Sequence, residues 1–481
     1  TTVPRRRLAY DELLANQLAL AVIRLHQRRL TGRRLTGTGR LRKQALAALP
    51  FDLTGAQKSA LAEIDADMAS DRRMLRLLQG DVGSGKTVVA LMAMLSAVEV
   101  GAQAAMMAPT EILARQHFAT IQPLAEAAGV PMALLTGRDK GRSREKTVED
   151  LAAGRIKLVV GTHALLQEEI EFQNLALAVI DEQHRFGVHQ RLSLAAKGDG
   201  IDILVTTATP IPRTLMLCAY GDMDVSRITE KPPGRQPVDT RVVPLARLDE
   251  VIDGIARQIR TGAKLFWVCP MVEESAVIDL AAATERHASL AARFGDERVV
   301  LVHGKMKGAD KDAAMAHFAK GNANILVATT VIEVGVDVPE ATIMVVEQAE
   351  RFGLAQLHQL RGRIGRGAKP STCLLLYGTP LTETAKARLG ILRETEDGFR
   401  IAEEDLRLRG AGELLGTRQS GLPEFRLANL ALHADLLAVA RDDARLILDR
   451  DPGLSSPRGK ALRTLLYLFE RDAAIGLLRA G

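Results

Sequence analysis

Aromatic residues and cysteines are scarce in this chain of 481 residues, and each scarcity argues against a class of protein. Aromatic side chains make up only 3% of the sequence, so a protein that grips single strands by stacking many bases is poorly supported. The three cysteines, Cys218, Cys269 and Cys373, follow no metal-ligand spacing, which argues against a zinc site or a disulfide framework. No apolar run is long enough to span a bilayer and no signal-peptide pattern opens the chain, so we expect a cytoplasmic protein with no membrane partner.

The sequence does have length and a mild excess of positive charge. A chain of 481 residues can form two or three domains, each with its own core. Lysines and arginines number 64 against 58 aspartates and glutamates, a formal net charge of +6, which permits binding of a polyanion without proving it. The first residue is Thr1 rather than a methionine, and we expect that a preceding module is missing.

A glycine-rich stretch at residues 80–87 matches the phosphate-loop pattern GxxxxGK(S/T) and organises the chain. Glycines at these positions let the backbone point successive N–H groups at phosphate oxygens, and the helix that follows adds its N-terminal dipole. Lys86 has the reach to neutralise the β- and γ-phosphates, and the Thr87 hydroxyl is placed to bind Mg²⁺. The predicted nucleotide-binding residues of the loop are Gly80, Gly83, Ser84, Gly85, Lys86 and Thr87.

Strands and helices alternate after this loop, which indicates a parallel sheet with chemistry at the carboxyl ends of its strands. We expect strands at residues 104–108, 156–160, 175–180 and 201–205, and a helix at residues 112–128. The third of these strands ends directly in Asp181, where a carboxylate would hold Mg²⁺, and Glu182, which would activate the attacking water. An isolated Asp-Glu pair lies in an exposed turn about as often as in a catalytic site. The phosphate loop upstream favours the catalytic interpretation. The last strand runs into a hydroxyl-rich turn at residues 206–213 that suits sensing of the γ-phosphate.

Apolar residues at helical spacing upstream of the loop predict one long helix over residues 8–30. Arginines crowd both ends of this segment, and they fit either a nucleic-acid backbone or a solvated linker face. Thr54 is a candidate N-cap for a helix that runs to Ile64. Gln57 has the donor and the acceptor needed to read an adenine edge, although this signal is weak by itself.

A stretch rich in proline and glycine at residues 229–237 predicts an inter-domain linker, after which the alternation restarts. Strands are expected at residues 264–269, 299–302, 325–328, 343–346 and 372–377. This second lobe has no phosphate loop, but residues 359–367 carry Arg361, Arg363 and Arg366 among glycines. Such arginines form either a solvated basic loop or the cations that meet a γ-phosphate, and Arg363 and Arg366 are the candidates for that catalytic role.

Eight blocks in order along the chain resemble the motifs of the superfamily 2 helicases. They are Gln57 and residues 80–87, 108–113, 161–163, 181–184, 206–210, 328–337 and 359–366. Within that superfamily, residues 181–191, 208–213 and 408–421 look specifically like the RecG family of bacterial fork-remodelling DNA translocases. The resemblance covers essentially the whole chain. It implies an α/β fold of two tandem RecA-like parallel-sheet lobes with an N-terminal linker helix and a C-terminal helical hairpin region.

The resemblance also implies an activity, in which ATP and Mg²⁺ bound between the lobes drive a motor on double-stranded DNA. Such motors reverse stalled replication forks and branch-migrate Holliday junctions in recombination and repair. The resemblance marks residues 396–429 as a translocation motif, and its implied DNA contacts are Arg407, Arg409, Arg418 and Gln419. From their chemistry alone, these four side chains fit phosphate contacts and ordinary polar residues of a loop equally well. In RecG-like proteins a wedge domain with an OB fold recognises the branch, and we expect that wedge to be the missing module.

Together, the patterns and the resemblance predict four segments. Residues 1–48 are a linker helix, 49–232 the ATP-binding lobe, 233–392 the second helicase lobe, and 393–481 the translocation hairpin with the C-terminal helices. We expect a monomer at the bacterial nucleoid, with branched DNA as its partner and single-strand-binding protein as a candidate partner. Two alternatives stay open: a transcription-repair coupling translocase, which shares the motor, and a nucleotide-gated DNA clamp that does not travel.

Overall fold

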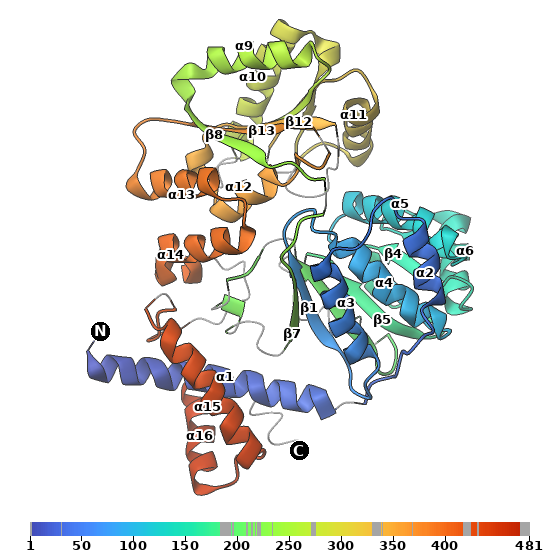
Figure 1. The fold of residues 1–481 in the computed structure, drawn as a ribbon, viewed down its shortest axis with the longest axis vertical. Coiled ribbons are helices and arrows are strands. Elements are labelled where there is room, and N and C mark those ends of the chain that lie inside the picture. Colours follow the sequence, from blue (N-terminus) through green and yellow to red (C-terminus); the bar gives the residue numbers. More distant parts are fainter. Residues whose placement is uncertain are drawn as a thin grey trace. The chain divides into compact units, whose positions relative to one another are not determined.

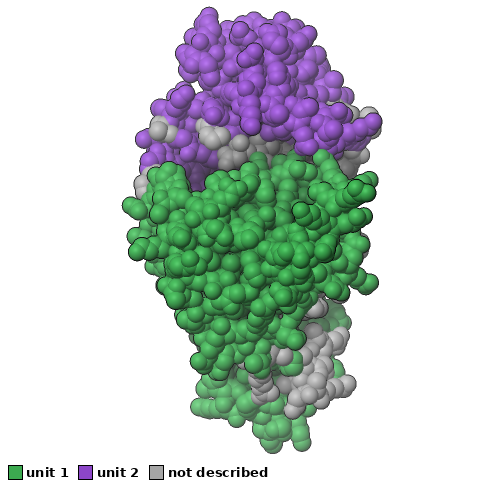
Figure 2. Space-filling view, turned by 90° about the vertical axis from the view of Figure 1, so that its right-hand side faces the viewer, with its two compact units in different colours: residues 1–80, 85–230, 409–481 green, residues 81–84, 231–408 purple. Residues whose placement is uncertain are grey.

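The chain forms two compact units in a computed structural model, which Figure 2 colours separately. Unit 1 comprises Thr1–Gly80, Gly85–Glu230 and Arg409–Gly481, and unit 2 comprises Asp81–Ser84 and Lys231–Leu408. The structure describes residues 2–471 except 30, 183–193, 195, 196, 208, 209, 213, 214, 217, 219–222, 233, 271–275, 330–337, 339, 368, 417–424 and 431, and it leaves out the side chains of 27–29, 276–280 and 409–416. Within these described ranges, no helix is long and apolar enough to cross a membrane.

Unit 1 is built on a parallel sheet of seven described strands in the order β3-β4-β2-β5-β6-β1-β7. The strands are β1 (Leu75–Gly80), β2 (Gln103–Met107), β3 (Met132–Leu135), β4 (Leu158–Gly161), β5 (Leu175–Ile180), β6 (Asp202–Thr207) and β7 (Asp224–Ile228). Every residue of β2, β5 and β6 is buried, as expected for parallel strands with a packed layer on each face. Strands β2, β4, β5 and β6 lie within two residues of the predicted ones, while β3 and β7 were not predicted. The first α/β lobe is therefore confirmed.

Helices connect these strands and cover the sheet of unit 1. They are α2 (Arg40–Ala47), α3 (Gly55–Met68), α4 (Lys86–Glu99), α5 (Glu111–Ala127) and α6 (Gly141–Ala152), with a 3-10 turn η1 (His163–Leu166). Helix α4 contacts β1, β2 and β5, and α5 contacts β3 and β4. Because α4 follows β1 directly, the loop between them lies at the carboxyl edge of the sheet, where parallel sheets bind ligands.

The N-terminal helix of unit 1 packs on helices from the other end of the chain (Figure 1). These elements are α1 (Val3–Arg29), α15 (Ala434–Arg450) and α16 (Pro457–Leu468). Helix α1 buries Leu13, Leu14 and Leu18, the stripe that predicts this helix from the sequence. It therefore serves as the scaffold for the C-terminal helices rather than as an isolated connector.

Unit 2 has a second parallel sheet, in the order β10-β11-β9-β12-β13-β8. Its strands are β8 (Val238–Pro244), β9 (Lys264–Val268), β10 (Val299–Val302), β11 (Ile325–Ala328), β12 (Ala341–Val346) and β13 (Ser371–Tyr377). Its helices are α9 (Leu248–Ile259), α10 (Ala276–Phe294), α11 (Gly308–Lys320), α12 (Leu354–Arg361), α13 (Glu383–Glu394) and the first part of α14 (Gly398–Gly416), with 3-10 turns η3 (Leu245–Arg247), η4 (Asp296–Arg298) and η6 (Ala349–Arg351). The second predicted lobe is therefore present.

Apolar side chains fill both faces of the second sheet. Phe266 and Met344 pack with residues of α11, α12 and α13 on one face. Trp267 packs on the other face with Ile255 of α9 and Leu290 of α10, and it is fully buried. The three cysteines of the chain are free and buried, so they pack as small core residues.

The boundaries of the two units agree with the four predicted segments only in part. The chain passes from unit 1 to unit 2 at Lys231, inside the predicted linker at residues 229–237. Residues 1–48 belong to unit 1, and the C-terminal segment is divided at Arg409 between the two units. The division of the chain into four functional segments stays a prediction.

Candidate functional site

The phosphate loop joins the end of β1 to the start of α4, as its pattern predicts. Gly83 and Gly85 adopt φ angles of 75° and 85°, the left-handed region in which a side chain is strained. Lys86 is buried, and its Nζ donates to the Gly80 carbonyl at 2.7 Å. The lysine therefore lies across the inside of the loop, where its charge and the N–H groups at the start of α4 fit a phosphate group.

Gln57 lies against this loop. Its Oε1 accepts from the Thr54 backbone N–H at 2.9 Å, and the Thr54 hydroxyl accepts from the Gln57 backbone N–H at 3.2 Å, a complete capping box that confirms Thr54 as N-cap. A Cβ added to Gly85 would lie only 2.2 Å from Gln57 Nε2. The buried Gln57 side chain therefore lies between the start of α3 and the phosphate loop. Its reading of adenine stays a prediction.

Asp181 lies at the carboxyl end of β5, next to β6, the strand that runs into the hydroxyl-rich turn. One oxygen, Oδ2, is 2.7 Å from His117 Nε2 on α5, and the Thr206 hydroxyl at the end of β6 donates to the other. The Asp181 side chain is only 13% exposed. Burial alone would raise its pKa, but His117, the Thr206 hydroxyl and Lys86 together hold the pKa of Asp181 well below its ordinary value.

The carboxyl group of Asp181 is therefore negatively charged and oriented, as a metal ligand must be. No group of three or more His, Cys, Asp and Glu side chains gathers into a metal site among the residues that the structure describes. A lone carboxylate together with Thr87 fits Mg²⁺, which usually takes one or two protein ligands and fills its other positions with phosphate oxygens and water. Sequence reasoning missed His117, because it lies 64 residues before Asp181 and no local pattern marks it.

Glu182 follows Asp181 with a φ of 55°, a left-handed conformation that costs free energy in any residue except glycine. Such conformations are concentrated at functional sites, where the surroundings hold them in place. Gln183, His184 and the turn residues 208 and 209 lie outside the described residues. The water-activating role of Glu182 stays a prediction.

The tip of the phosphate loop, Asp81–Ser84, belongs to unit 2 by its contacts. Asp81 Oδ1 lies 2.9 Å from His358 Nε2 on α12, and Asp81 Oδ2 accepts from the Gly398 backbone N–H at 3.2 Å. Arg235 Nη1 donates to the Val82 carbonyl at 2.8 Å. Within unit 2 the loop tip is therefore held by residues that no sequence motif identified.

Of the three arginines at the end of α12 and just after it, one has a structural role and two remain catalytic candidates. Arg361 is buried, and it donates to the Leu392 carbonyl and to His358 Nδ1. Arg366 is half-buried and its Nε lies 3.4 Å from the Gly362 carbonyl, while Arg363 is also half-buried. The structure thus assigns Arg361 to packing and leaves Arg363 and Arg366 as the catalytic candidates.

The predicted DNA contacts are described only in part. Arg407 on α14 is exposed and its Nε donates to Glu404 at 2.7 Å, a surface pair that contributes little and leaves the guanidinium accessible. Arg409 is in the same helix, but its side chain is outside the described part of the chain. Arg418 and Gln419 lie in residues 417–424, which the structure does not describe.

Family models match successive stretches of this chain. DEAD/DEAH box helicase matches residues 54–217, and Helicase conserved C-terminal domain matches residues 246–368. The third model, ATP-dependent DNA helicase RecG, domain 3, C-terminal, matches residues 395–472.

Curated relatives extend the match to nearly the whole chain. The ATP-dependent DNA helicase RecG of Escherichia coli (strain K12) is 49% identical over 453 residues, which cover 93% of this chain and 65% of the relative. The protein of that name from Bacillus subtilis (strain 168) is 46% identical over 461 residues, covering 95% and 67%. The chain therefore spans about two thirds of the length of these relatives.

Solved structures agree with the sequence comparison. A structure described as RecG bound to three-way DNA junction aligns with a TM-score of 0.74 and 45% identity, covering 90% of this chain and 57% of that chain. S. cerevisiae Dbp5 bound to RNA and ADP BeF3 aligns with a TM-score of 0.56 at 16% identity, covering 79% and 93%. The second likeness shows the fold alone.

Proposed function

The chain belongs to the RecG family of ATP-dependent DNA helicases, and we propose that it couples ATP hydrolysis to translocation on branched double-stranded DNA. The observation that carries this proposal is the group formed by the phosphate loop, Lys86 and Asp181 at one edge of the first sheet. A second lobe of the same fold without a phosphate loop is what a two-lobed nucleotide motor requires.

Within this proposal, the residues of the first lobe hold ATP and Mg²⁺. Bound Mg²⁺ would polarise the phosphate oxygens. Lys86 would compensate the charge of the β- and γ-phosphates, and Thr87 and Asp181 would provide the protein ligands of the metal. His117 and Thr206 orient the Asp181 carboxylate by binding one oxygen each. Glu182 orients and deprotonates the attacking water.

The remaining predicted residues contact the γ-phosphate, the adenine base or the DNA. Arg363 and Arg366 of the second lobe stabilise the charge that develops on the γ-phosphate, and Gln57 reads the adenine edge. The DNA-contacting segment is residues 396–429, through Arg407, Arg409, Arg418 and Gln419. The solved relative on a three-way DNA junction supports branched DNA as the substrate, which includes stalled forks and Holliday junctions. We also propose that the protein acts as a monomer at the bacterial nucleoid with single-strand-binding protein as a partner.

DNA-stimulated ATP hydrolysis tests the enzymatic part of this proposal. Lys86→Ala removes the charge that compensates the phosphates, so we expect turnover to fall by about 10² or more. Lys146→Ala, an exposed lysine on α6, is the matched control and should retain wild-type turnover. Glu182→Gln should keep ATP bound but unhydrolysed, because it removes a base and leaves the phosphate contacts. Near-normal turnover in Lys86→Ala would show that the phosphate loop is not the catalytic site.

The match to the RecG domain 3 model favours this proposal over a transcription-repair coupling translocase, which shares the motor. The alternative of a nucleotide-gated clamp shares the ATP site as well. It differs in one respect, because a clamp binds and releases DNA without moving along it. A measurement of movement rather than of hydrolysis therefore separates the two.

A further inference from the structure

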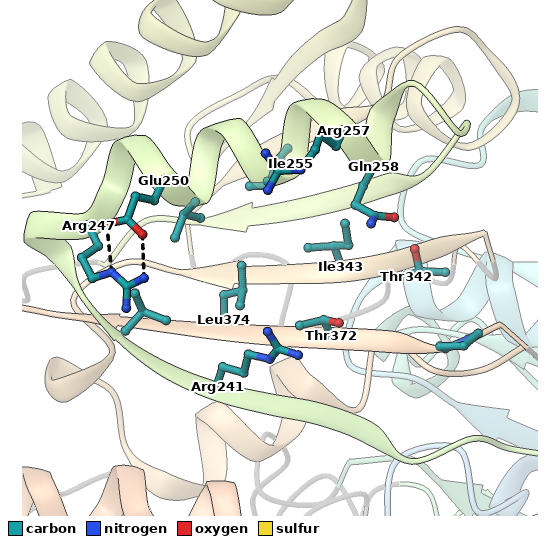
Figure 3. A pocket seen from close by; sticks show the side chains of 14 residues that line it. Arg241, Arg247, Glu250, Ile255, Arg257, Gln258, Thr342, Ile343, Thr372 and Leu374 are labelled. Atoms are coloured by element: carbon teal, nitrogen blue, oxygen red, sulfur yellow. Dashed lines mark hydrogen bonds and ion pairs between the residues drawn. The ribbon is translucent and has the colours of Figure 1, made fainter.

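The second lobe has a groove of about 620 Å³ whose lining residues belong to none of the helicase motifs (Figure 3). It lies between α9 and the outer strands β13 and β8. Parallel sheets are normally covered on both faces, and one face of these two strands is covered by α13. On the other face α9 packs through Ile252, Ile255 and Ile259 but leaves the outer margin open. The groove is therefore an incompletely covered part of a hydrophobic layer.

The floor and the rim of the groove differ in chemistry. Val243, Val251 and Leu374 lie on the floor, half-buried, next to the buried Ile343. Figure 3 shows Arg241 on the strand side and Arg257 on the helix side of this floor. An apolar floor between two cationic sides fits a ligand that carries both apolar and acidic groups.

The rim carries three arginines, Arg241, Arg247 and Arg257, and one acid, Glu250. With Asp239, which pairs with Arg241 from just outside the lining, one net positive charge is left. Arg247 is engaged by Glu250 through two bonds of 2.6 and 3.0 Å. Arg241 pairs with Asp239 at 2.7 Å, where both side chains are more than half exposed. Since such surface pairs are worth little, their arginines can be recruited by an incoming carboxylate. The side chain of Arg257 forms no ion pair or hydrogen bond with another residue in the described part of the chain.

The polar groups of the groove fit a peptide backbone. Thr342, Thr372 and the amide of Gln258 line it, and their side chains form no hydrogen bond with another residue that the structure describes. Figure 3 shows the Gln258 amide pointing toward Thr342 across the groove. These hydroxyl and amide groups supply donors and acceptors for N–H and C=O groups laid along the floor.

We propose that this groove binds an acidic peptide segment with apolar side chains, supplied by a partner protein. Nucleic acid fits less well, because no aromatic residue lines the groove to stack a base and phosphates gain nothing from an apolar floor. A second copy of this chain is disfavoured by its net charge of +6, since an acidic ligand is required. This groove is distinct from the proposed ATP site, because its lining residues take no part in holding ATP.

The test uses residues 1–481 and a fluorescent nine-residue peptide in which Asp and Glu alternate with Leu and Phe. Fluorescence anisotropy at about 0.1 M salt should show saturable binding, which weakens as salt rises. The double variant Arg241→Ala/Arg257→Ala should bind the peptide at least tenfold more weakly. Arg260→Ala is the matched control, an exposed arginine at the end of α9 outside the groove, and it should bind like the wild type.

DNA-stimulated ATP hydrolysis of the double variant should equal that of the wild type, which shows that the fold is intact. A peptide with Asn and Gln in place of the acids should not bind. The proposal is overturned if the neutral peptide binds equally or if the double variant retains its affinity for the acidic one. It is equally overturned if the double variant instead loses duplex DNA binding, or loses a dimer seen by sedimentation, because the groove would then hold DNA or a second copy.

Discussion

Asp202 is a fully buried carboxyl group at the start of β6, and it illustrates how one side chain couples stability to pH. Its Oδ1 accepts from the Met74 backbone N–H at 2.7 Å, while Oδ2 has no hydrogen-bond partner among the described residues. Burial raises the pKa of Asp202 to about 7, with a smaller contribution from Asp67, and the bond from Met74 opposes it. The group therefore holds its proton more tightly in the folded protein than in the unfolded chain, whose aspartates titrate near ~3.9.

The first prediction follows from the sign of this shift. Because the folded-state pKa is raised, the stabilisation is fully present below about pH 4 and is lost as pH rises through about 7. At about 1.4 kcal/mol for each pKa unit, the change is at most about 4 kcal/mol. Asp202→Asn keeps an acceptor for Met74 and removes this dependence, so the gap in unfolding free energy between variant and wild type should widen from pH 5 to pH 8.

Denaturant unfolding followed by circular dichroism measures this gap, since the single tryptophan, Trp267, lies in unit 2 and does not report on β6. Asp199→Asn, an exposed aspartate just before β6, is the control and should parallel the wild type. An equal gap at pH 5 and pH 8 would mean that the pKa of Asp202 is not raised.

The residues of the candidate ATP site differ in how far the sequence predicts them. Gly80 and Lys86 are predictable because the phosphate loop is a local pattern, in which a few neighbouring residues dictate the backbone. The partners of Asp181 are not, since His117 and Thr206 reach it from other elements of the fold. The same limit applies to the capping box of Gln57, whose buried side chain accepts from the Thr54 backbone, while its reading of adenine stays a prediction.

Among the elements, α1 joins the two ends of unit 1 through Glu12. This side chain is 2% exposed, and its oxygens accept from the backbone N–H groups of Arg426, Leu427 and Ala428 at 2.6, 2.8 and 2.7 Å. Asn16, one turn further along, donates to the Cys218 carbonyl at 3.1 Å. The helix thus ties the segment that precedes α15 to the first lobe.

The second prediction concerns the hydrogen bonds that Glu12 accepts. Glu12→Gln leaves one acceptor and places an NH₂ group opposite backbone donors, so we expect a loss of about 2 kcal/mol in local stability. Hydrogen exchange of α15 and α16 should accelerate, while that of α9 and α10 stays unchanged. Asp11→Asn, which breaks only the pair with the largely exposed Arg7, should leave exchange as it is in the wild type. Unchanged exchange in the Glu12 variant would argue that packing of α1 alone holds the C-terminal helices.

The elements that the sequence predicts are those with a strong apolar pattern. Buried strands such as β5 are uninterrupted apolar runs, so their bounds agree with the prediction. Helix α6 is missed because half of its residues are charged and it buries only Leu151. Strand β8 is missed because it lies at the sheet edge, carries Asp239 and Arg241 on its exposed side, and directly follows the linker.

For the whole molecule, the third prediction concerns the choice of DNA. The proposed contacts are cationic or polar side chains that bind phosphates, and such contacts carry no information about branching. Few aromatic residues are available to hold displaced single strands. We therefore expect residues 1–481 to bind a fork and a matched linear duplex with affinities that differ by less than about tenfold at one stated salt concentration. A larger preference for the fork would place branch recognition within these residues.

The central claim is that this chain moves along DNA. Displacement of a third strand from a triplex measures that movement directly, since a translocating motor strips the strand from the duplex track. We predict ATP-dependent displacement by the wild type, with a lag that lengthens as the track is extended, and none by Lys86→Ala. ATP hydrolysis that is stimulated by DNA but displaces no strand would contradict the account, because the protein would then be a nucleotide-gated clamp.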